Sequence, residues 1–396
     1  MAFESGIRAL RLEFVRETTR GATPANPDWL LYSDAVQSFS LSPTGSINPR
    51  GNIGTPDVVN FNAGTESHEF SVTYDLQRWF SSTGDAAYDG MHRITDGSLP
   101  ASHSVVGRAA AGDLGIDGGG SYIFYVATGA LVNTVTLAGE PESGEPIIVT
   151  LDYMCEKLRA YQVDQPSAGT TLEVVSTSAS DTMDITIESV DAGTSETITL
   201  TGLTPSSGVA SFTSIDAAWL DAEPIGDITI SDGANDLMTI YGKTTYGNRE
   251  GDRGIPLLGS GSHGAAIGTA YENILGDTIE RPGGTNLGID AEVSSVSMSV
   301  ENAVEGNSTI YSIGKALSEG PRTINLNATL FGPTASYDSM IDHLTATENN
   351  IVWTLTGGTL TLVGAAMTTI GQITRDTGLA VMTVDNTFQG KSLTIA

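Results

Sequence analysis

The sequence contains a single cysteine, few basic residues and no long apolar run, and each shortage narrows what the chain can do. Because Cys155 is alone, no intrachain disulfide and no site built from several cysteines can form. No apolar run approaches the roughly 18 residues that a membrane-spanning helix needs. The first residues also lack the apolar core of a signal peptide. We therefore expect a protein without a membrane partner that is made in the cytoplasm.

Basic residues are scarcer than acidic ones. Lys and Arg total 18 against 47 Asp and Glu, which gives a formal net charge of −29. Charged residues make up 16% of the chain, against about 25% in an ordinary globular protein. A surface so poor in bases cannot neutralise many phosphates, which argues against tight nucleic-acid binding. Adaptation to high salt explains the same acidity, and the two explanations are compatible. Lysine occurs only at Lys157, Lys243, Lys315 and Lys391.

No catalytic constellation stands out, and we predict no catalytic, cofactor-binding or metal-binding residues. The Gly-rich run at 112–120 lacks the Lys-Ser/Thr pair of a phosphate loop, and its Asp113 and Asp117 lack the spacing of a calcium loop. Cys155 has no histidine placed beside it and is expected to be a buried small residue. The histidines show no zinc-binding spacing and are expected on the surface or on helix faces. They are His68, His92, His103, His263 and His343.

Glycine is abundant, with 46 residues, and apolar residues alternate with polar ones in many short windows. Both features favour short strands joined by turns, so the fold class is mainly β. Residues 69–77 alternate cleanly, with apolar side chains on one face, and residues 323–331 do the same. Residues 1–33 are expected to form an extended arm or a hairpin, and residues 43–66 are turn-rich. Further strands are predicted at 34–41, 121–127, 130–137, 146–154, 291–300, 350–356, 359–363 and 378–388.

The two ends of the chain repeat the same order of elements: a strand, a long turn, a strand, a helix and three strands. The helices are predicted at 85–94 and 334–344. Letters match in the same order, since VxSxSL from Val36 corresponds to VxSxSM from Val293, and AxYDxM from Ala86 corresponds to AxYDxM from Ala335. This common order predicts an internal duplication.

The segment between the repeats has a different character. It is rich in Ser and Thr, with turn signals every 8–12 residues or so, which is typical of a small β-sandwich. Residues 242–289 look like a long irregular connection, best explained as an arm lying along a neighbouring copy. The predicted strands of the sandwich are 172–176, 183–189, 196–201, 209–213, 227–231 and 238–241. The predicted domains are 1–164, 165–245 and 246–396.

The run ETTRGATP at 17–24, continuing to Pro27, Asp28 and Trp29, resembles the start of major tail tube proteins of long-tailed, siphovirus-like viruses. The resemblance implies two tandem tail-tube domains, each an antiparallel β-sandwich or barrel with one flanking helix. The middle segment is similar to the immunoglobulin-like decorations of that family. The acidity and the position of the insert depart from the family pattern. A host that lives in high salt would account for the acidity.

The resemblance further implies a virion protein that self-assembles in the host cytoplasm and delivers DNA. Two modules in one chain would close a pseudo-hexameric ring as a homotrimer, and such rings would stack into a tube. A tape-measure protein and viral DNA would occupy the lumen without tight binding, with tail terminator and baseplate proteins at the ends. The candidate wall strands are 69–77, 323–331, 34–41 and 291–300, and the sequence does not say which side of them faces inward.

Three alternatives remain at this stage. A baseplate hub or tail-end ring built on the same module would form one small ring and no polymer. A surface β-sandwich adhesin would need an export signal, which is not visible. A carbohydrate-active enzyme would need a carboxylate pair in an aromatic-lined cleft. The tryptophans do not suggest such a cleft, because Trp29, Trp79, Trp219 and Trp353 are spread one to a region.

Overall fold

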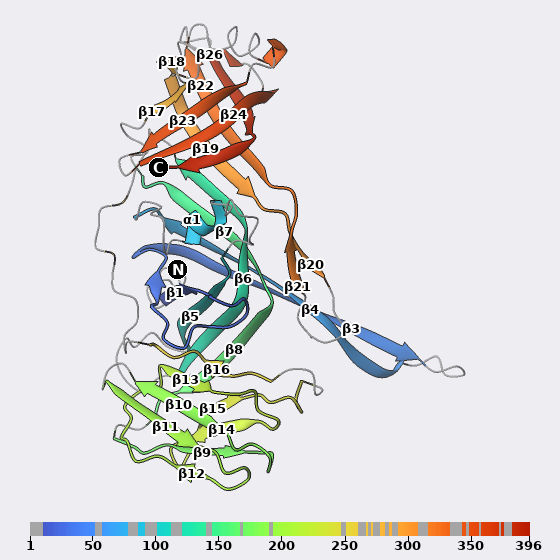
Figure 1. Ribbon diagram of the computed structural model, residues 1–396, viewed down its shortest axis with the longest axis vertical. Helices are drawn as coiled ribbons and strands as arrows, with labels where there is room; N and C mark the ends of the chain where they lie inside the picture. The colour runs from blue at the N-terminus through green and yellow to red at the C-terminus, as the bar shows by residue number, and fades with distance from the viewer. Residues whose placement is uncertain are drawn as a thin grey trace.

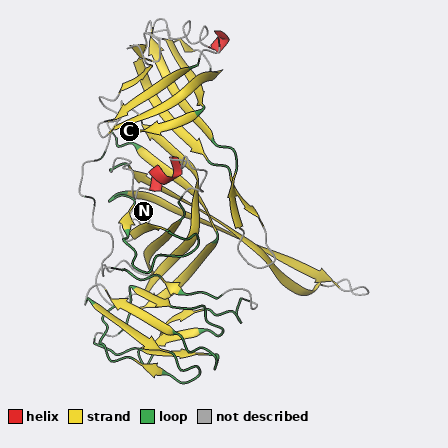
Figure 2. Cartoon of the chain, viewed as in Figure 1, coloured by secondary structure: helices red, strands yellow, loops and turns green. Residues whose placement is uncertain are grey.

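The computed structural model is mainly β, with 64% strand and 4% helix in antiparallel sheets, which confirms the predicted class (Figure 2). The molecule is elongated, and its three parts follow one another along the long axis (Figure 1). The structure describes residues 11–51, 58–77, 86–91, 101–111, 121–139, 145–166, 169–189, 193–246, 251–259, 267, 271, 278–281, 285–286, 292–307, 316–332, 343–345, 348–355, 358–371, 374–375 and 382–396.

The first strand set forms two sheets that share one long strand, β6. One sheet has the order β3-β4-β7-β6 and the other has the order β2-β1-β5-β6-β8. Helix α1 (Ala86–Met91) packs beside β6. The strands are β1 (Arg11–Arg16), β2 (Leu30–Leu31), β3 (Val36–Gly51), β4 (Val58–Asp75), β5 (His103–Ala111), β6 (Ser121–Gly139), β7 (Ile148–Cys155) and β8 (Lys157–Asp164).

The second strand set repeats this scheme, with β24 as the shared long strand. One sheet has the order β19-β22-β26-β24 and the other has the order β18-β17-β23-β24-β27. The strands are β17 (Thr278–Arg281), β18 (Thr285–Asn286), β19 (Glu292–Glu301), β20 (Val304–Asn307), β21 (Ala316–Glu319), β22 (Thr323–Gly332), β23 (Asn349–Leu355), β24 (Gly358–Ile370), β25 (Thr374–Arg375), β26 (Met382–Gly390) and β27 (Ser392–Ile395).

The two sets also place their β-bulges at corresponding positions. The β3–β4 register shifts between Val36 and Ser38, and the β19–β22 register shifts between Val293 and Ser295. The matching letters from Val36 and from Val293 therefore occupy matching positions in the sheets, while Ala335–Met340 of the other match lie outside the described residues. Further shifts correspond in the same way in β5 and β23, between His103/Val105 and Asn349/Ile351, and in β6 and β24, between Val132/Thr134 and Met367/Thr369.

Each long strand changes sheets at a glycine with a left-handed backbone. Gly129 in β6 has φ 64° and Gly364 in β24 has φ 58°. On one side of Gly129, β6 pairs with β5 and β8, and on the other side it pairs with β7 and β19. An L side chain rarely adopts a positive φ, so glycine permits this change of direction at both places.

The two sets join through a β ladder. Strand β6 pairs antiparallel with β19, from Val296 opposite Gly139 to Glu301 opposite Thr134. Asn302 adds hydrogen bonds from its side-chain amide to the carbonyl oxygens of Gly90 and Val132, both 2.9 Å. We call the resulting eight strands, β3-β4-β7-β6-β19-β22-β26-β24, the joined sheet. One apolar core runs beneath it through both sets.

The middle sandwich consists of two four-stranded sheets with the orders β11-β10-β13-β16 and β12-β9-β14-β15. Its core also includes side chains of the first strand set, among them Trp29, Phe124 and Tyr161, so it packs directly on that set. Its strands are β9 (Glu173–Ser176), β10 (Asp184–Ser189), β11 (Thr194–Thr199), β12 (Ser206–Ser207), β13 (Ala217–Leu220), β14 (Ile228–Ser231), β15 (Asp236–Ile240) and β16 (Gly254–Ile255).

Several local expectations differ from the structure. The turn-rich stretch 43–66 largely extends the β3–β4 hairpin, because β3 continues to Gly51 and β4 begins at Val58. No strand covers 209–213, although Phe212 is buried, so its hydrophobicity reflects core packing. The sandwich also uses β16, which lies beyond the predicted boundary at 245. By contrast, the hairpin that was one of two forms expected for residues 1–33 is present in residues 11–33, where β1 pairs with β2. The helix predicted at 334–344 lies mostly outside the described residues, with helix only at 343–345.

Candidate functional site

One face of the joined sheet is mainly polar, with a polar side chain on seven of the eight strands in one transverse row and Ala366 on β24. Residues directly opposite each other in paired strands share a face. A single transverse row therefore runs across the sheet, and none of its side chains is buried. The row is Ser38, Thr73, Thr150, Thr136, Ser299, Asn325, Gln389 and Ala366.

The adjacent row points to the opposite face and is apolar. Seven of its eight side chains are buried, and Val36 at the sheet edge is half-buried. The period of two along each strand therefore separates a core face from a polar face without interruption between the two strand sets. The row is Val36, Tyr74, Val149, Leu137, Met298, Leu326, Phe388 and Met367.

We call the polar side the hydroxyl face. Its charged residues are all acidic, namely Glu69, Asp75, Asp152, Glu301 and Asp385, and no Lys or Arg occurs among its described residues. It comprises residues 38, 40, 42, 69, 71, 73, 75, 134, 136, 138, 148, 150, 152, 154, 295, 297, 299, 301, 323, 325, 327, 329, 366, 369, 385, 387 and 389.

Hydrogen bonds within the hydroxyl face satisfy part of its polarity. Thr387 donates to Asn327 at 2.8 Å, and Thr329 donates to Asp385 at 2.7 Å. Partial burial raises the pKa of Asp75 above its ordinary value. A depression of about 330 Å³ lies where β6, β19, β22 and β26 meet. The face therefore offers acids, hydroxyls and amides, a surface that does not attract phosphate.

The candidate wall strands of the sequence analysis meet in this one sheet. Strands β3, β4, β19 and β22 cover the predicted ranges and contribute many of its hydroxyl-face residues. The sequence showed the alternation but not the face, because the core partners lie far away in the chain. Strand β6 at the centre was predicted as two separate strands, and its pairing with β19 carried no recognisable sequence signal.

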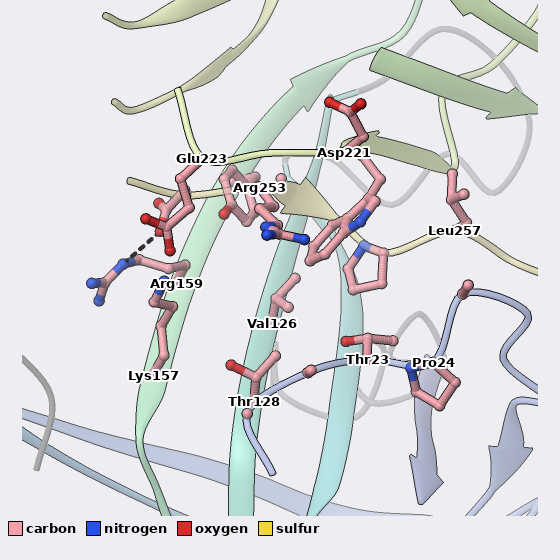
Figure 3. Close-up of a pocket in the computed structure, with 18 residues that line it drawn as sticks. Thr23, Pro24, Val126, Thr128, Lys157, Arg159, Asp221, Glu223, Arg253 and Leu257 are labelled. Carbon is pink, nitrogen blue, oxygen red and sulfur yellow. Dashed lines mark hydrogen bonds and ion pairs between the residues drawn. The ribbon is translucent and has the colours of Figure 1, made fainter. Parts of the chain in front are cut away.

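A second polar cluster lies between the first strand set and the middle sandwich, at a cleft of about 460 Å³ (Figure 3). Arg159 of β8 forms ion pairs with Glu66 at 2.9 Å and with Asp252 at 3.0 Å. The Tyr246 hydroxyl donates to Asp252 at 2.9 Å, and the Arg159 guanidinium lies 4.8 Å from the Tyr246 ring centre. Each of these groups has a partner within the cluster, so the cluster braces the sandwich against the sheet.

Ionisation in this cluster is strongly biased. The hydrogen bond from His68 and the charge of Arg159 outweigh burial and lower the pKa of Glu66 to about 2. The carboxylates of Asp252 and Glu66 outweigh burial at Arg159 and raise the pKa of its guanidinium. Burial and the neighbouring Asp252 raise the pKa of Tyr246. The ion pairs of Arg159 therefore persist across the whole neutral range.

The histidine expectation is wrong for two residues. His68 and His103 lie in strands and are buried, 5% and 0% exposed. His103 lies 2.9 Å from Asp89 of α1, and His68 lies 2.9 Å from Glu66. These carboxylates account for the burial of two polar rings, which hydropathy alone did not indicate. His343 is exposed.

The other residues considered in the sequence fall into two groups. Cys155 is buried, and burial raises the pKa of its thiol. Glu17 is buried and accepts four hydrogen bonds, from Gly21, Gly129, Ser102 and Ser104. Asp113, Asp117, His92 and His263 lie outside the described residues.

In the part of the chain that the structure describes, no cluster of His, Cys, Asp and Glu has a metal-binding arrangement. Within the same residues, no helix has the length and apolar character needed to cross a membrane.

No protein-family model matches the chain, and no curated protein matches it. The strand pairing and the chemistry of the hydroxyl face are therefore the features that bear on function.

Proposed function

We propose that the chain is a tail tube protein of a long-tailed virus, a structural virion protein that polymerises into stacked rings around a channel for DNA. In this proposal the two strand sets are duplicated tube modules. The middle sandwich is an immunoglobulin-like decoration on the outside. The protein is not an enzyme and assembles in the host cytoplasm into the virion tail.

The observation that carries the proposal is the hydroxyl face. A conduit for DNA must not hold phosphates, because each phosphate neutralised by Lys or Arg strengthens retention. The described residues of the face span eight strands, include no Lys or Arg and carry five acids. A sheet curved with this face inward gives a wall past which DNA slides. Rows of Ser, Thr and Asn keep such a wall hydrated.

The continuity of the joined sheet supports the assembly. A monomeric sheet of eight strands exposes two edges, which is a liability unless another chain covers them. Closure of the sheet into a barrel removes both edges. Three chains would supply six modules and close a pseudo-sixfold ring, and such rings would stack heterologously into a tube. The tape-measure protein and DNA would occupy the lumen, with terminator and baseplate proteins at the tube ends.

Electron microscopy of the purified full chain tests the polymer. We expect hollow tubes of stacked rings, with three chains in each ring. A monodisperse monomer at both low and high salt would contradict the proposal. One discrete ring without stacking would favour the alternative, a baseplate hub or tail-end ring. Six chains in each ring would overturn the stoichiometry.

Chemical labelling tests which face lines the channel. Gln389→Cys places a thiol on the hydroxyl face, and Ser195→Cys places one on an exposed strand of the sandwich. Before assembly, a long polyethylene glycol maleimide should modify both variants. In tubes it should modify only Ser195→Cys, because the polymer does not enter the channel. Equal modification of both variants in tubes would show that the hydroxyl face lies outside.

A further inference from the structure

The joined sheet ends in two open edges, β3 and β24. Among the described residues, no strand pairs with the outer side of β3 or with the outer side of the last residues of β24. In β4, the backbone N–H of Asp75 donates to the carbonyl oxygen of Ala35, and that of Leu76 donates to the carbonyl oxygen of Ile147. Alternate residues of β4 therefore direct their backbone hydrogen bonds to β3 and to β7. Ser40 and Ser42 lie opposite Ser71 and Glu69, so their backbone groups point toward β4.

It follows that the backbone groups of Phe39, Leu41 and Pro43 point to the open edge of β3. At the other end of the sheet, Gly371 donates to Asp385 in β26. The neighbouring Ile370 therefore directs its backbone groups to the open edge of β24.

These edges correspond to the two strands that pair inside the chain, with one residue more between Gly371 and Thr374 than between the equivalent Thr136 and Ala138. Strand β3 corresponds to β19, and β24 continued by β25 corresponds to β6. The β6–β19 ladder places Ser299 opposite Thr136, Val300 opposite Val135, and Ser297 opposite Ala138. The open edge β3 is therefore equivalent to β19, and the open edge β24 is equivalent to β6. Since β6 and β19 pair within the chain, β24 and β3 have matching edges.

Side-chain burial differs between the internal junction and the open edges. Val296, Met298 and Val135 at the junction are 3%, 2% and 1% exposed. Their counterparts Phe39, Leu41 and Ile370 are equally apolar but only half-buried. Apolar side chains at half-covered positions indicate that a partner completes this core. The partner that fits is another strand set of the same kind.

We infer that β3 of one chain pairs antiparallel with β24 and β25 of a second copy, in the register of the β6–β19 junction. Ser42 then lies opposite Gly371 and Pro43 opposite Ile370 of the other chain. Ser40 lies opposite Thr374, because there are three residue steps from Gly371 to Thr374 where β26 has two, from Asp385 to Thr383. This inference deepens the proposed tube and rests on it, because it specifies which edges meet and in which register.

Pro43 makes the junction between chains weaker than the one within the chain. Its counterpart Val300 has a backbone N–H directed at β6, since Asn302, two residues on, donates to Asn133 of β6 at 2.7 Å. Pro43 has no N–H to donate. A proline on an edge strand also hinders unspecific pairing before assembly. The β3 edge can thus pair with a matching strand, but that junction has one backbone hydrogen bond fewer than the β6–β19 junction.

Disulfide trapping tests the register. Pairs that do not exchange hydrogen bonds have Cα atoms about 4.5 Å apart, which suits a disulfide. We expect Ser40→Cys with Thr374→Cys to link chains in assembled tubes under copper phenanthroline oxidation. On a non-reducing gel the products should form a ladder that ends at the closed ring. Ser38→Cys with Thr374→Cys, two residues out of register, is the matched control and should stay unlinked.

The internal pair Ser297→Cys with Ala138→Cys is the positive control. It should form a disulfide within one chain, visible as faster migration without any ladder. Tubes that link in the control register, or in neither register, would overturn the inferred junction while leaving the tube standing. Absence of any assembly, with the internal disulfide formed, would instead count against the proposed function.

Restoring the missing donor gives an independent test. Pro43→Val should strengthen the junction, and we expect the minimum concentration for tube formation to fall roughly two- to tenfold, the worth of one net hydrogen bond. An unchanged or higher minimum concentration, with the variant still folded by circular dichroism, would contradict the pairing of this edge.

Discussion

Where the first strand set has Gly107, the second has Trp353, at corresponding positions of β5 and β23. A side chain at Gly107 would meet Leu12 at 3.2 Å and the Phe39 ring at 3.4 Å. Trp353 is 2% exposed. In the first set, the side chains of Leu12 in β1 and Phe39 in β3 therefore fill the space under the joined sheet. In the second set, the Trp353 side chain of β23 fills the corresponding space. Strand register is preserved although the packing residues come from different strands.

The two sets also differ in buried polar groups. The first set buries Glu17, Asp89 and His103, each with hydrogen-bond partners. In the described part of the second set, the buried polar side chains are two asparagines, Asn302 and Asn386. Register is therefore fixed by backbone pairing and bulges, while polar cores vary.

The largest expected effect tests how the second core is filled. Trp353→Ala should lower the free energy of unfolding by about 3–5 kcal/mol, because it leaves a cavity that neighbouring strands cannot close. Gly107→Ala is the matched change in the first set and should cost only about 1 kcal/mol. Urea unfolding followed by circular dichroism measures both. Equal losses would show that the two positions are not packed as described.

The next effect tests the polar core of the first set. Glu17→Ala removes the acceptor of hydrogen bonds from Ser102 at 2.6 Å, Gly21 at 2.7 Å and Gly129 at 2.9 Å. Buried donors left without partners cost about 1–3 kcal/mol each, so we expect a loss of about 3 kcal/mol or more. Asp385→Ala, an exposed acid of the second set, should change stability by less than about 0.5 kcal/mol. Urea unfolding measures both variants, and equal losses of unfolding free energy would contradict this prediction.

A smaller effect compares the two glycine bends. Gly129→Ala and Gly364→Ala both force a left-handed alanine, which costs about 1–2 kcal/mol. The new methyl group at Gly129 would lie 2.8 Å from the Glu156 carboxylate oxygen, whereas at Gly364 it meets the end of Lys391 at 3.1 Å. The lysine can move aside, so Gly129→Ala should be the more damaging. Thermal unfolding ranks the two variants, and the opposite order would show that the contact with Glu156 does not make the bend at Gly129 the tighter one.

The smallest effect is pH-dependent and concerns the Arg159 cluster, which braces the first set against the middle sandwich. The folded pKa of Glu66 is about 2, below its ordinary 4.5. A depressed carboxyl pKa stabilises the fold above about pH 4.5, and this contribution fades as the pH falls towards 2. Glu66→Gln removes it, so the difference in unfolding midpoint between wild type and variant should be constant near neutral pH and shrink below pH 4.5. A difference independent of pH would show that the Glu66 charge does not contribute.

The sequence by itself determined the β class, the acidic balance and the candidate wall strands, because these depend on composition and on alternation within a strand. The match between VxSxSL at Val36 and VxSxSM at Val293 also placed two strands that occupy corresponding positions. Such signals are local, since a period of two says which side chains share a face.

Only the tertiary structure decided which face is polar across both strand sets, that β6 pairs with β19, and that 43–66 largely extends a hairpin. It also decided that Glu17 and His103 are buried and that Gly129 bends β6 between sheets. Each of these depends on partners distant in the chain. A carboxylate, an imidazole or a left-handed glycine acquires its role only when the opposing strand supplies its donors, its charge or its turn.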